Sequence, residues 1–224
     1  MFGPRFEDRT EAGQVLARFL RDYAGREDVR VLALPRGGVP VAFEVARALG
    51  APLDVFLVRK LGTPGHEELA MGAIASGGVR ILNRDVVDEL DISPEAIQAV
   101  TEAEHRELLR RERDYRAGRP MPDIEGRVVI LVDDGLATGS TMRAAVAAVR
   151  EHAPARIVVA VPVGSEDACE LLAREADEVV CVSTPEPFRA VGLWYEVFEQ
   201  TTDAQVRALL AQAAPEPEQP PRMP

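Results

Sequence analysis

Short apolar runs alternate along the chain with segments in which apolar positions recur every three or four residues. The segments 38–49, 140–152 and 165–175 show this helical periodicity. Strands that alternate with helices form a parallel sheet with helices on both faces, so the pattern predicts an α/β fold with a five-stranded core sheet. The predicted strands are Val29–Leu34, Leu53–Val58, Arg127–Val132, Arg156–Val161 and Glu178–Val182.

Three further helices are expected outside this alternation. Ser93-Pro94-Glu95 is typical of a helix start, with serine as the cap, proline at the first position and an acid in the first turn. That helix extends to about Ala117, and 203–213 forms the last helix. Residues 10–24 form the first helix, and one face of it carries Val15, Leu16, Phe19, Leu20 and Tyr23.

Two segments lack a regular pattern. Residues 62–80 are rich in glycine and short of helical periodicity, which predicts a long loop or a hairpin. The segment Pro215–Pro224 is rich in proline and glutamate and is expected to be a flexible tail. No internal repeat is visible.

Composition narrows the class of protein. Of the 224 residues, 46% are hydrophobic and the formal net charge is −11. The apolar content excludes a disordered chain, and no apolar run approaches the ~18 residues of a membrane helix. The first residues show no secretory signal, so a cytoplasmic location is expected. The acidic charge argues against broad nucleic-acid binding, and the scattered histidines and cysteines indicate no zinc site.

The segment from Val128 to Thr141 carries the strongest chemical signal. A buried strand ends in Asp133 and Asp134, and a loop of small and hydroxyl residues leads into a helix. Backbone N–H groups, hydroxyls and a helix N-terminus suit a phosphate. The two carboxylates suit vicinal hydroxyls or a Mg²⁺ ion shared with a second phosphate. The combination predicts a site for a phosphorylated ribose, and the loop that would hold the phosphate comprises Ala137, Thr138, Gly139, Ser140 and Thr141.

This segment differs from two other phosphate-binding motifs. No lysine precedes the hydroxyl pair Ser140-Thr141, so it is not a Walker A loop. In dinucleotide-binding motifs the glycines come first and the acid follows about 20 residues later.

The segment resembles the phosphoribosyl-pyrophosphate (PRPP) motif of type I phosphoribosyltransferases, and the resemblance covers roughly residues 5–200. The opening 6–13 is similar to a bacterial group of predicted phosphoribosyltransferases. The resemblance implies a Rossmann-like core, a flexible hairpin at about 60–80 and a small C-terminal hood at about 183–200. Residues 1–213 would form one domain, followed by the tail 214–224. Asp133 and Asp134 would hold the ribose hydroxyls, directly or through a Mg²⁺ ion bound by way of water, and the loop after them the 5-phosphate.

Two turns at strand ends complete the resemblance. Leu34–Val39 is similar to the family's pyrophosphate loop, in which Gly37 and Gly38 allow close approach of an anion and Arg36 adds a bidentate charge. The segment 59–68 is similar to the family's mobile catalytic loop. Its candidate residues are Arg59 for pyrophosphate and Lys60 and His66, together with Arg36, for catalysis.

Lys60 is the only lysine in the chain, since every other cationic side chain is arginine. A compact ammonium and a planar guanidinium are not interchangeable at a site that recognises charge. Glu67 stands where the family's loop has glycine after the histidine, so the role of His66 is less well defined by the resemblance.

The acceptor base is left open by the sequence. Ala137 occupies the position at which 6-oxopurine enzymes of the family carry an aspartate. The spacing of 184–195 is nevertheless similar to their purine-site segment, in which an aromatic residue, here Phe188, stacks on the base. The alternative interpretation of Phe188 is ordinary packing of a C-terminal cap.

The resemblance implies a Mg²⁺-dependent transferase that joins PRPP to a nitrogenous base, and a homodimer. Two alternatives stay open. One is a regulatory protein that binds PRPP without transferase activity, and the other is a nucleotide hydrolase or phosphorylase that uses the same site.

Overall fold

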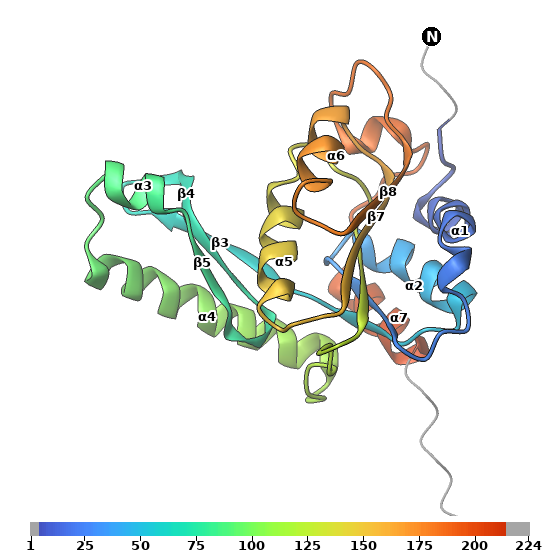
Figure 1. Cartoon of the computed structure of the whole chain (residues 1–224), viewed down its shortest axis with the longest axis horizontal. Helices are drawn as coiled ribbons and strands as arrows, with labels where there is room; N and C mark the ends of the chain where they lie inside the picture. The colour runs from blue at the N-terminus through green and yellow to red at the C-terminus, as the bar shows by residue number, and fades with distance from the viewer. Residues whose placement is uncertain (1–4, 214–224) are drawn as a thin grey trace, which may run out of the picture.

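A five-stranded parallel sheet lies at the centre of the computed structural model, which describes residues 5–213 (Figure 1). The strand order is β2-β1-β6-β7-β8, and each neighbouring pair is parallel. The predicted fold class is therefore confirmed. The strands are β1 (Val29–Ala33), β2 (Leu53–Val55), β6 (Val128–Val132), β7 (Arg156–Val163) and β8 (Glu178–Ser183).

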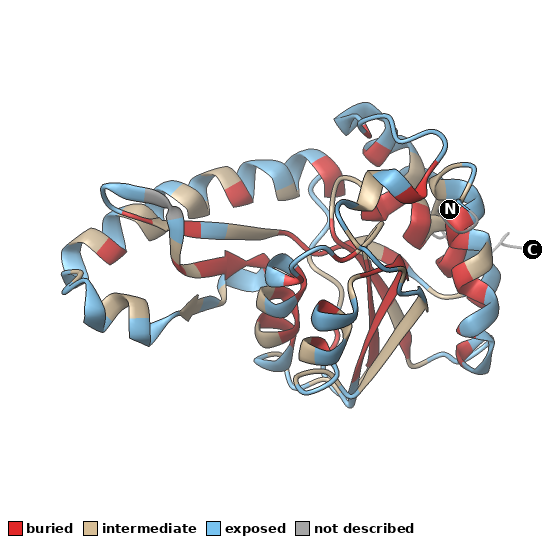
Figure 2. Ribbon diagram, turned by 90° about the horizontal axis from the view of Figure 1, so that it is seen from above, coloured by how far each residue is buried: buried red, intermediate tan, exposed pale blue. Residues whose placement is uncertain are grey.

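Helices cover both faces of the sheet, and alternate strand positions point into two separate cores. Val31 and Ile130 pack with α1, α2 and α7, whereas Leu32 and Leu131 pack with α5 and α6. Figure 2 shows the buried residues along the central strands and on the helix sides that face them. The helices are α1 (Arg9–Phe19), α2 (Gly38–Leu49), α5 (Ser140–Arg150), α6 (Glu166–Leu172) and α7 (Asp203–Ala213).

The first predicted helix is divided into α1 and a short 3₁₀ helix, η1 (Arg21–Tyr23). The prediction for its buried face is wrong at Phe19, which is 59% exposed. The buried face is centred instead on Gly13 and its neighbours, because α2 approaches there closely. A Cβ atom at Gly13 would lie 2.6 Å from the carbonyl oxygen of Val41.

Residues 58–116, called the arm below, project from the central sheet (Figure 1). The segment expected as a loop or hairpin is a three-stranded antiparallel sheet of order β3-β4-β5. The long helix α4 covers one face of this sheet and begins at the Ser93 cap, as predicted. The arm comprises β3 (Val58–Thr63), β4 (His66–Ala75), the 3₁₀ helix η2 (Ser76–Gly78), β5 (Arg80–Leu82), α3 (Arg84–Glu89) and α4 (Pro94–Arg116).

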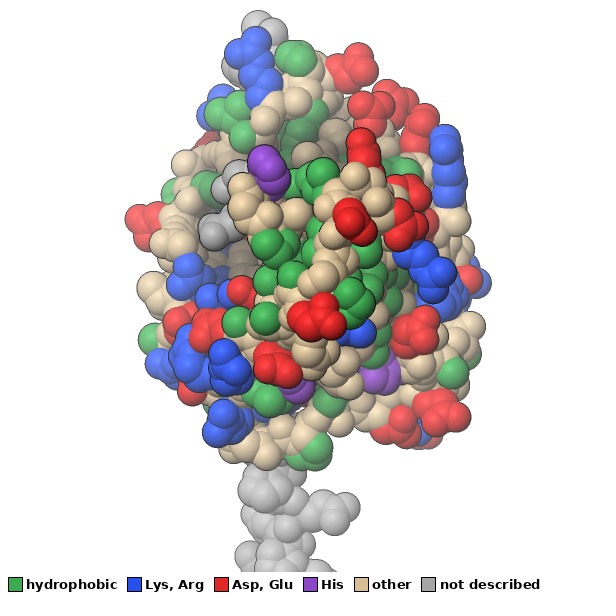
Figure 3. Space-filling model, turned by 90° about the vertical axis from the view of Figure 1, so that its left-hand side faces the viewer, with side chains coloured by type: hydrophobic (Ala, Val, Ile, Leu, Met, Phe, Trp, Pro, Cys, Tyr) green, Lys and Arg blue, Asp and Glu red, His purple; other side chains and the backbone are tan. Residues whose placement is uncertain are grey.

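The outer part of the arm carries exposed apolar side chains. Leu69 on β4 and Leu90 after α3 are 44% and 42% exposed. Figure 3 looks onto this side of the molecule and shows hydrophobic side chains among charged ones. The arm therefore presents a mixed apolar and charged surface.

The hood, residues 183–200, crosses the carboxyl end of the sheet and meets the start of the chain. The backbone N–H groups of Glu196 and Val197 donate to the carbonyl oxygens of Phe6 and Glu7 at 2.8 and 2.9 Å. The hood contains the 3₁₀ helix η3 (Val191–Trp194). The predicted tail, 214–224, lies outside the described residues.

Candidate active site

Two turns that follow neighbouring strands of the central sheet touch one another. β1 and β6 are paired in register up to Ala33 and Val132, so the turn after each strand begins at the same level. A Cβ atom at Gly37 would lie 2.0 Å from Oδ2 of Asp134, and one at Gly38 would lie 2.9 Å from the Cα atom of Asp133. Only glycine allows this approach, and the predicted pyrophosphate turn and acid pair therefore form one surface.

Asp133 and Asp134 form a closely spaced, half-buried pair. The backbone N–H of Asp134 donates to Oδ1 of Asp133 at 2.8 Å. Burial and the charge of Asp134 raise the pKa of Asp133 well above its usual value. Burial also raises the pKa of Asp134, although the neighbouring Arg9 opposes this shift. The pair concentrates negative charge that donors or a cation could stabilise.

Arg9 and Tyr195 complete the surroundings of the acid pair. Nε and Nη2 of Arg9 lie 2.9 and 2.8 Å from Oδ2 of Asp134, and the Tyr195 hydroxyl donates to the Asp134 carbonyl oxygen at 2.6 Å. The sequence did not indicate either role. The opening segment 6–13 resembled a family but contained no motif that indicated a binding or catalytic role. Arg9 and Asp134 are also 125 positions apart in the sequence.

The predicted 5-phosphate loop leads from the acid pair into α5. Gly139 adopts a left-handed conformation with φ of 72° and caps α5 without a side-chain hydrogen bond. The hydroxyls of Thr138 and Ser140 lie 2.6 Å apart, and the Ser165 hydroxyl fixes the carbonyl of Ala137 at 2.7 Å. The helices α1, α4 and α6 are capped by an Asp or Ser side chain, whereas α5, like α2 and α3, has no side-chain hydrogen bond from its cap residue. The N-terminus of α5 carries the partial positive charge of a helix start.

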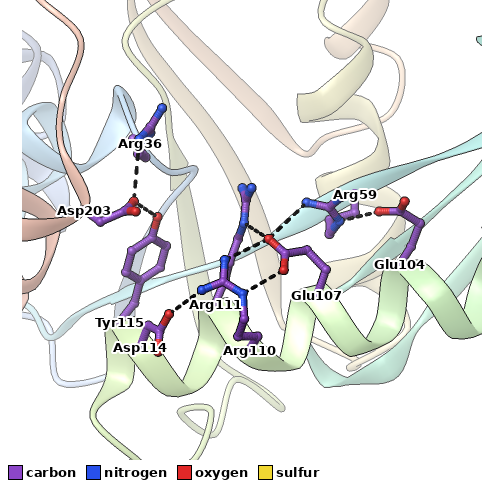
Figure 4. A network of polar contacts seen from close by, with 9 residues as sticks. All are labelled: Arg36, Arg59, Glu104, Glu107, Arg110, Arg111, Asp114, Tyr115 and Asp203. Carbon is purple, nitrogen blue, oxygen red and sulfur yellow. Dashed lines mark hydrogen bonds and ion pairs between the residues drawn. The ribbon is translucent and has the colours of Figure 1, made fainter.

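Arg36 follows a cis peptide bond after Pro35, and its guanidinium faces Asp203 at the start of α7 (Figure 4). Its Nη1 lies 3.7 Å from Oδ1 of Asp203, which accepts a hydrogen bond from the Tyr115 hydroxyl at 2.6 Å. Burial and this hydrogen bond raise the pKa of Tyr115 to about 12. The pyrophosphate turn is thereby connected to α7 and to the end of α4.

Arg59 and Lys60 are consecutive on β3 and therefore lie on opposite faces of the arm sheet. Arg59 pairs with Glu104 and, at 4.0 Å, with Glu107, both on α4 (Figure 4). Lys60 lines a cavity of about 1000 Å³ between the arm sheet and α5. Ser140 and Thr141 of the 5-phosphate loop line the same cavity. The structure thus associates Lys60, but not Arg59, with the predicted phosphate region.

His66 and Phe188 lie at two other places. His66 is exposed at the turn between β3 and β4, and it lines neither the cavity beside Lys60 nor the cavity beside Phe188. Phe188 packs against the small core formed by Ala12, Val163, Trp194 and Tyr195. It also lines a second cavity of about 570 Å³ beside the start of α6. Packing and ligand contact are therefore both compatible with its position.

The chain belongs to the phosphoribosyl transferase family, because the model of the phosphoribosyl transferase domain matches residues 7–196. The resemblance noted in the sequence is thus confirmed. The five-stranded parallel sheet, with the turns after β1 and β6 in contact, agrees with membership of this family.

Relatives of high similarity support the same family. Two Mycobacterium tuberculosis proteins named "Putative phosphoribosyl transferase", from different strains, are 50% identical to this chain over 208 residues. The match covers 93% of this chain and 47% of theirs, so the chain spans about half the length of these curated relatives. The crystal structure of TT1426 from Thermus thermophilus shares 45% identity and a TM-score of 0.83, and covers 94% of this chain and 100% of that one.

A more distant structure shows the fold alone. The AQ2163 protein from Aquifex aeolicus has 13% identity and a TM-score of 0.50, over 82% of this chain and 78% of that one. Within residues 5–213, no helix is both long enough and apolar enough to cross a bilayer.

Proposed function

We propose that the chain transfers the 5-phosphoribosyl group of PRPP to a nitrogenous base, with Mg²⁺, and releases pyrophosphate. The contact between the turn at Gly37 and Gly38 and the acid pair carries this proposal. An anion at the turn and a ribose at the carboxylates would then be covalent neighbours, as they are in PRPP. The start of α5, where the cap residue Gly139 makes no side-chain hydrogen bond, would hold the 5-phosphate at the other end of the sugar.

In the proposed reaction, the bond between ribose C1 and a pyrophosphate oxygen breaks, and a bond between C1 and a base nitrogen forms. The oxygen keeps the bonding electrons, so negative charge grows on the leaving group. Arg36 at the turn and Lys60, which lines the same cavity as Thr141, are the cations that would oppose this charge. Asp133 and Asp134 hold the sugar hydroxyls, so the chain contributes mainly orientation and charge stabilisation.

The residues present fit a Mg²⁺ ion that is shared with the substrate. The half-buried acid pair offers carboxylate oxygens and has raised pKa values that a cation would lower. Among the described residues, no group of three or more potential ligands comes together, so Asp133 and Asp134 would share the ion with substrate oxygens and water. When bound, Mg²⁺ would neutralise charge on the pyrophosphate.

The acceptor base would occupy the cavity beside Phe188. Three carboxylates, Glu166, Asp167 and Glu186, line this cavity together with the ring. Their charge favours a neutral base with N–H donors over a base that carries its own carboxylate. A panel of bases should therefore give pyrophosphate release with neutral heterocycles and little with acidic ones.

The PRPP assignment can be tested without knowing the base. Calorimetric titration with PRPP and Mg²⁺ should show binding, and Asp133→Asn with Asp134→Asn should weaken it on the order of 100-fold, because charged hydrogen bonds to the sugar are lost. The matched control is Asp22→Asn with Asp123→Asn, since both residues are exposed and away from the strand ends. Unchanged affinity in the acid-pair variant would contradict the proposal. Binding without turnover of any base would favour the regulatory alternative.

A further inference from the structure

Arg9 makes more polar contacts at the acid pair than any side chain that the sequence pointed to. Its side chain is only 11% exposed. Nε and Nη2 both reach Oδ2 of Asp134, and Nη1 donates to the carbonyl oxygen of Glu199 at 2.7 Å. The guanidinium carbon lies 4.0 Å from the centre of the Phe198 ring. All three donor nitrogens and one planar face are therefore engaged.

We propose that Arg9 is a positioning residue for the PRPP site and acts through Asp134. This inference rests on the proposed function and adds to it a residue that is distant from the acid pair in the sequence. Arg9 fixes which oxygen of Asp134 faces the protein. Oδ2 is held by the guanidinium and lies over the pyrophosphate turn, at the point where a Cβ atom of Gly37 would be 2.0 Å away. Oδ1 is then the oxygen left to accept from a ribose hydroxyl.

The geometry requires arginine rather than a generic cation. A guanidinium can place two N–H groups on one carboxylate, direct a third to a carbonyl and stack a flat face on an aromatic ring. Lysine at this position would keep the charge but could not make these contacts at the same time. Arg9→Lys should therefore preserve only part of the positioning.

The same contacts connect the hood to the acid pair. Glu199 and Phe198 hold the guanidinium, and Tyr195 holds the carbonyl of Asp134 from the same segment. Displacement of the hood would release Arg9 and Asp134 together. The hood thus supports the ribose site as well as bordering the cavity next to Phe188.

A double-mutant cycle separates positioning from a merely structural role. PRPP affinity in the presence of Mg²⁺ is measured by calorimetry for the wild type, Arg9→Gln, Asp134→Asn and the double variant. Arg9→Gln should weaken binding by on the order of 10- to 100-fold, as is typical when the partner of a ligand-binding carboxylate is removed. In the Asp134→Asn background the same change should have an effect below about threefold, because its target is already altered.

Two variants serve as controls. Arg9→Lys should recover part of the affinity, and it remains informative if Arg9→Gln does not fold. Arg156→Gln removes an arginine–carboxylate pair with Glu178, 2.9 Å long, at the start of β7 and should leave PRPP affinity unchanged. Melting temperatures of all variants show whether any loss reflects unfolding.

The outcomes distinguish this inference from the proposed function. Absence of PRPP binding by the wild type would overturn both. Wild-type binding with additive losses in the cycle, or with affinity unaffected by Arg9→Gln, would overturn the role of Arg9 and leave the PRPP site intact. A coupled loss with partial rescue by lysine is the result expected.

Discussion

At the scale of single residues, Gly37 controls how closely the pyrophosphate turn approaches the acid pair. Its φ of −62° is accessible to any residue, so alanine would cost little in backbone conformation. The added methyl group would nevertheless overlap Oδ2 of Asp134. Gly37→Ala should therefore destabilise the fold by about 1–3 kcal/mol through overpacking and weaken PRPP binding more than tenfold. Thermal unfolding and calorimetry check the two effects, and unchanged PRPP affinity would contradict the contact.

Lys60 provides a second test at this scale. If it stabilises charge that grows only on the leaving pyrophosphate, Lys60→Ala should lower kcat by on the order of 10²–10³ with a smaller loss of PRPP affinity. Lys60→Arg should recover part of the rate. Arg80→Ala, an exposed cation on the same arm, is the matched control. Equal losses in binding and turnover would remove the catalytic role.

The sequence pointed to the candidate residues that lie in recognisable turns at strand ends, and it did not point to Arg9, which no such pattern marks. Asp133, Asp134 and the following loop form one continuous motif. The order of strand, acid pair and hydroxyl-rich loop is enough to predict a site for a phosphorylated ribose. Arg9 reaches the same carboxylate across 125 positions, and nothing in its neighbourhood identifies it as a site residue. The different surroundings of Arg59 and Lys60 were also not predictable from the sequence. Alternation along a strand places them on opposite faces of the arm sheet, but it does not say that α4 covers one face and the cavity next to α5 the other.

At the scale of elements, the central strands were predictable because they are buried on both faces and consist of continuous apolar runs. For residues 62–80 the sequence predicted a loop or a hairpin, and β3 and β4 form a hairpin. The third strand, β5, was not predicted, because the segment includes many glycines and alanines and its pairing is irregular between Leu61 and Thr63. The strands of the arm are stabilised by packing against α4 and by pairing with one another, and their side-chain pattern alone does not indicate strands.

The arm helix α4 offers a test by pH. Hydrogen bonds from Arg110 and Arg111 lower the pKa of Glu107 to about 2. Because the pKa of Glu107 is lower in the folded protein than its usual value of 4.5, its ionised carboxylate stabilises the fold at pH values above 4.5. This stabilisation is lost as the pH falls toward 2. Glu107→Gln should therefore be less stable than the wild type at pH 7, by up to ~1 kcal/mol at low salt, and the difference should disappear near pH 2.

Urea unfolding at several pH values measures this difference. Glu102→Gln is the control, because Glu102 is exposed on the same helix and accepts from Gln98 instead of an arginine. A difference between Glu107→Gln and the wild type that stays constant with pH would show that the arginine pairs do not stabilise α4.

At the scale of the whole molecule, we expect at least a dimer. The arm exposes Leu69 and Leu90 beyond the body of the protein, and Phe19 forms a separate exposed apolar position on α1. Sedimentation at micromolar concentration should show the dimer, and Leu90→Asp should shift it toward monomer, whereas Phe19→Asp should not. The reverse pattern would place the interface on α1, and a wild-type monomer would contradict the expectation.

The contact of Arg9 with Glu199 also has a consequence for the order in which the protein is made. The N-terminal part of a chain leaves the ribosome first, so Arg9 emerges before the acid pair, and the acid pair before the hood that holds Arg9. The parallel strands can begin to associate before then, but Arg9 can gain its Glu199 and Phe198 contacts only after residue 199 leaves the exit tunnel. The central sheet can therefore begin to form before the hood is made, whereas the proposed ribose site is completed only after the hood has emerged.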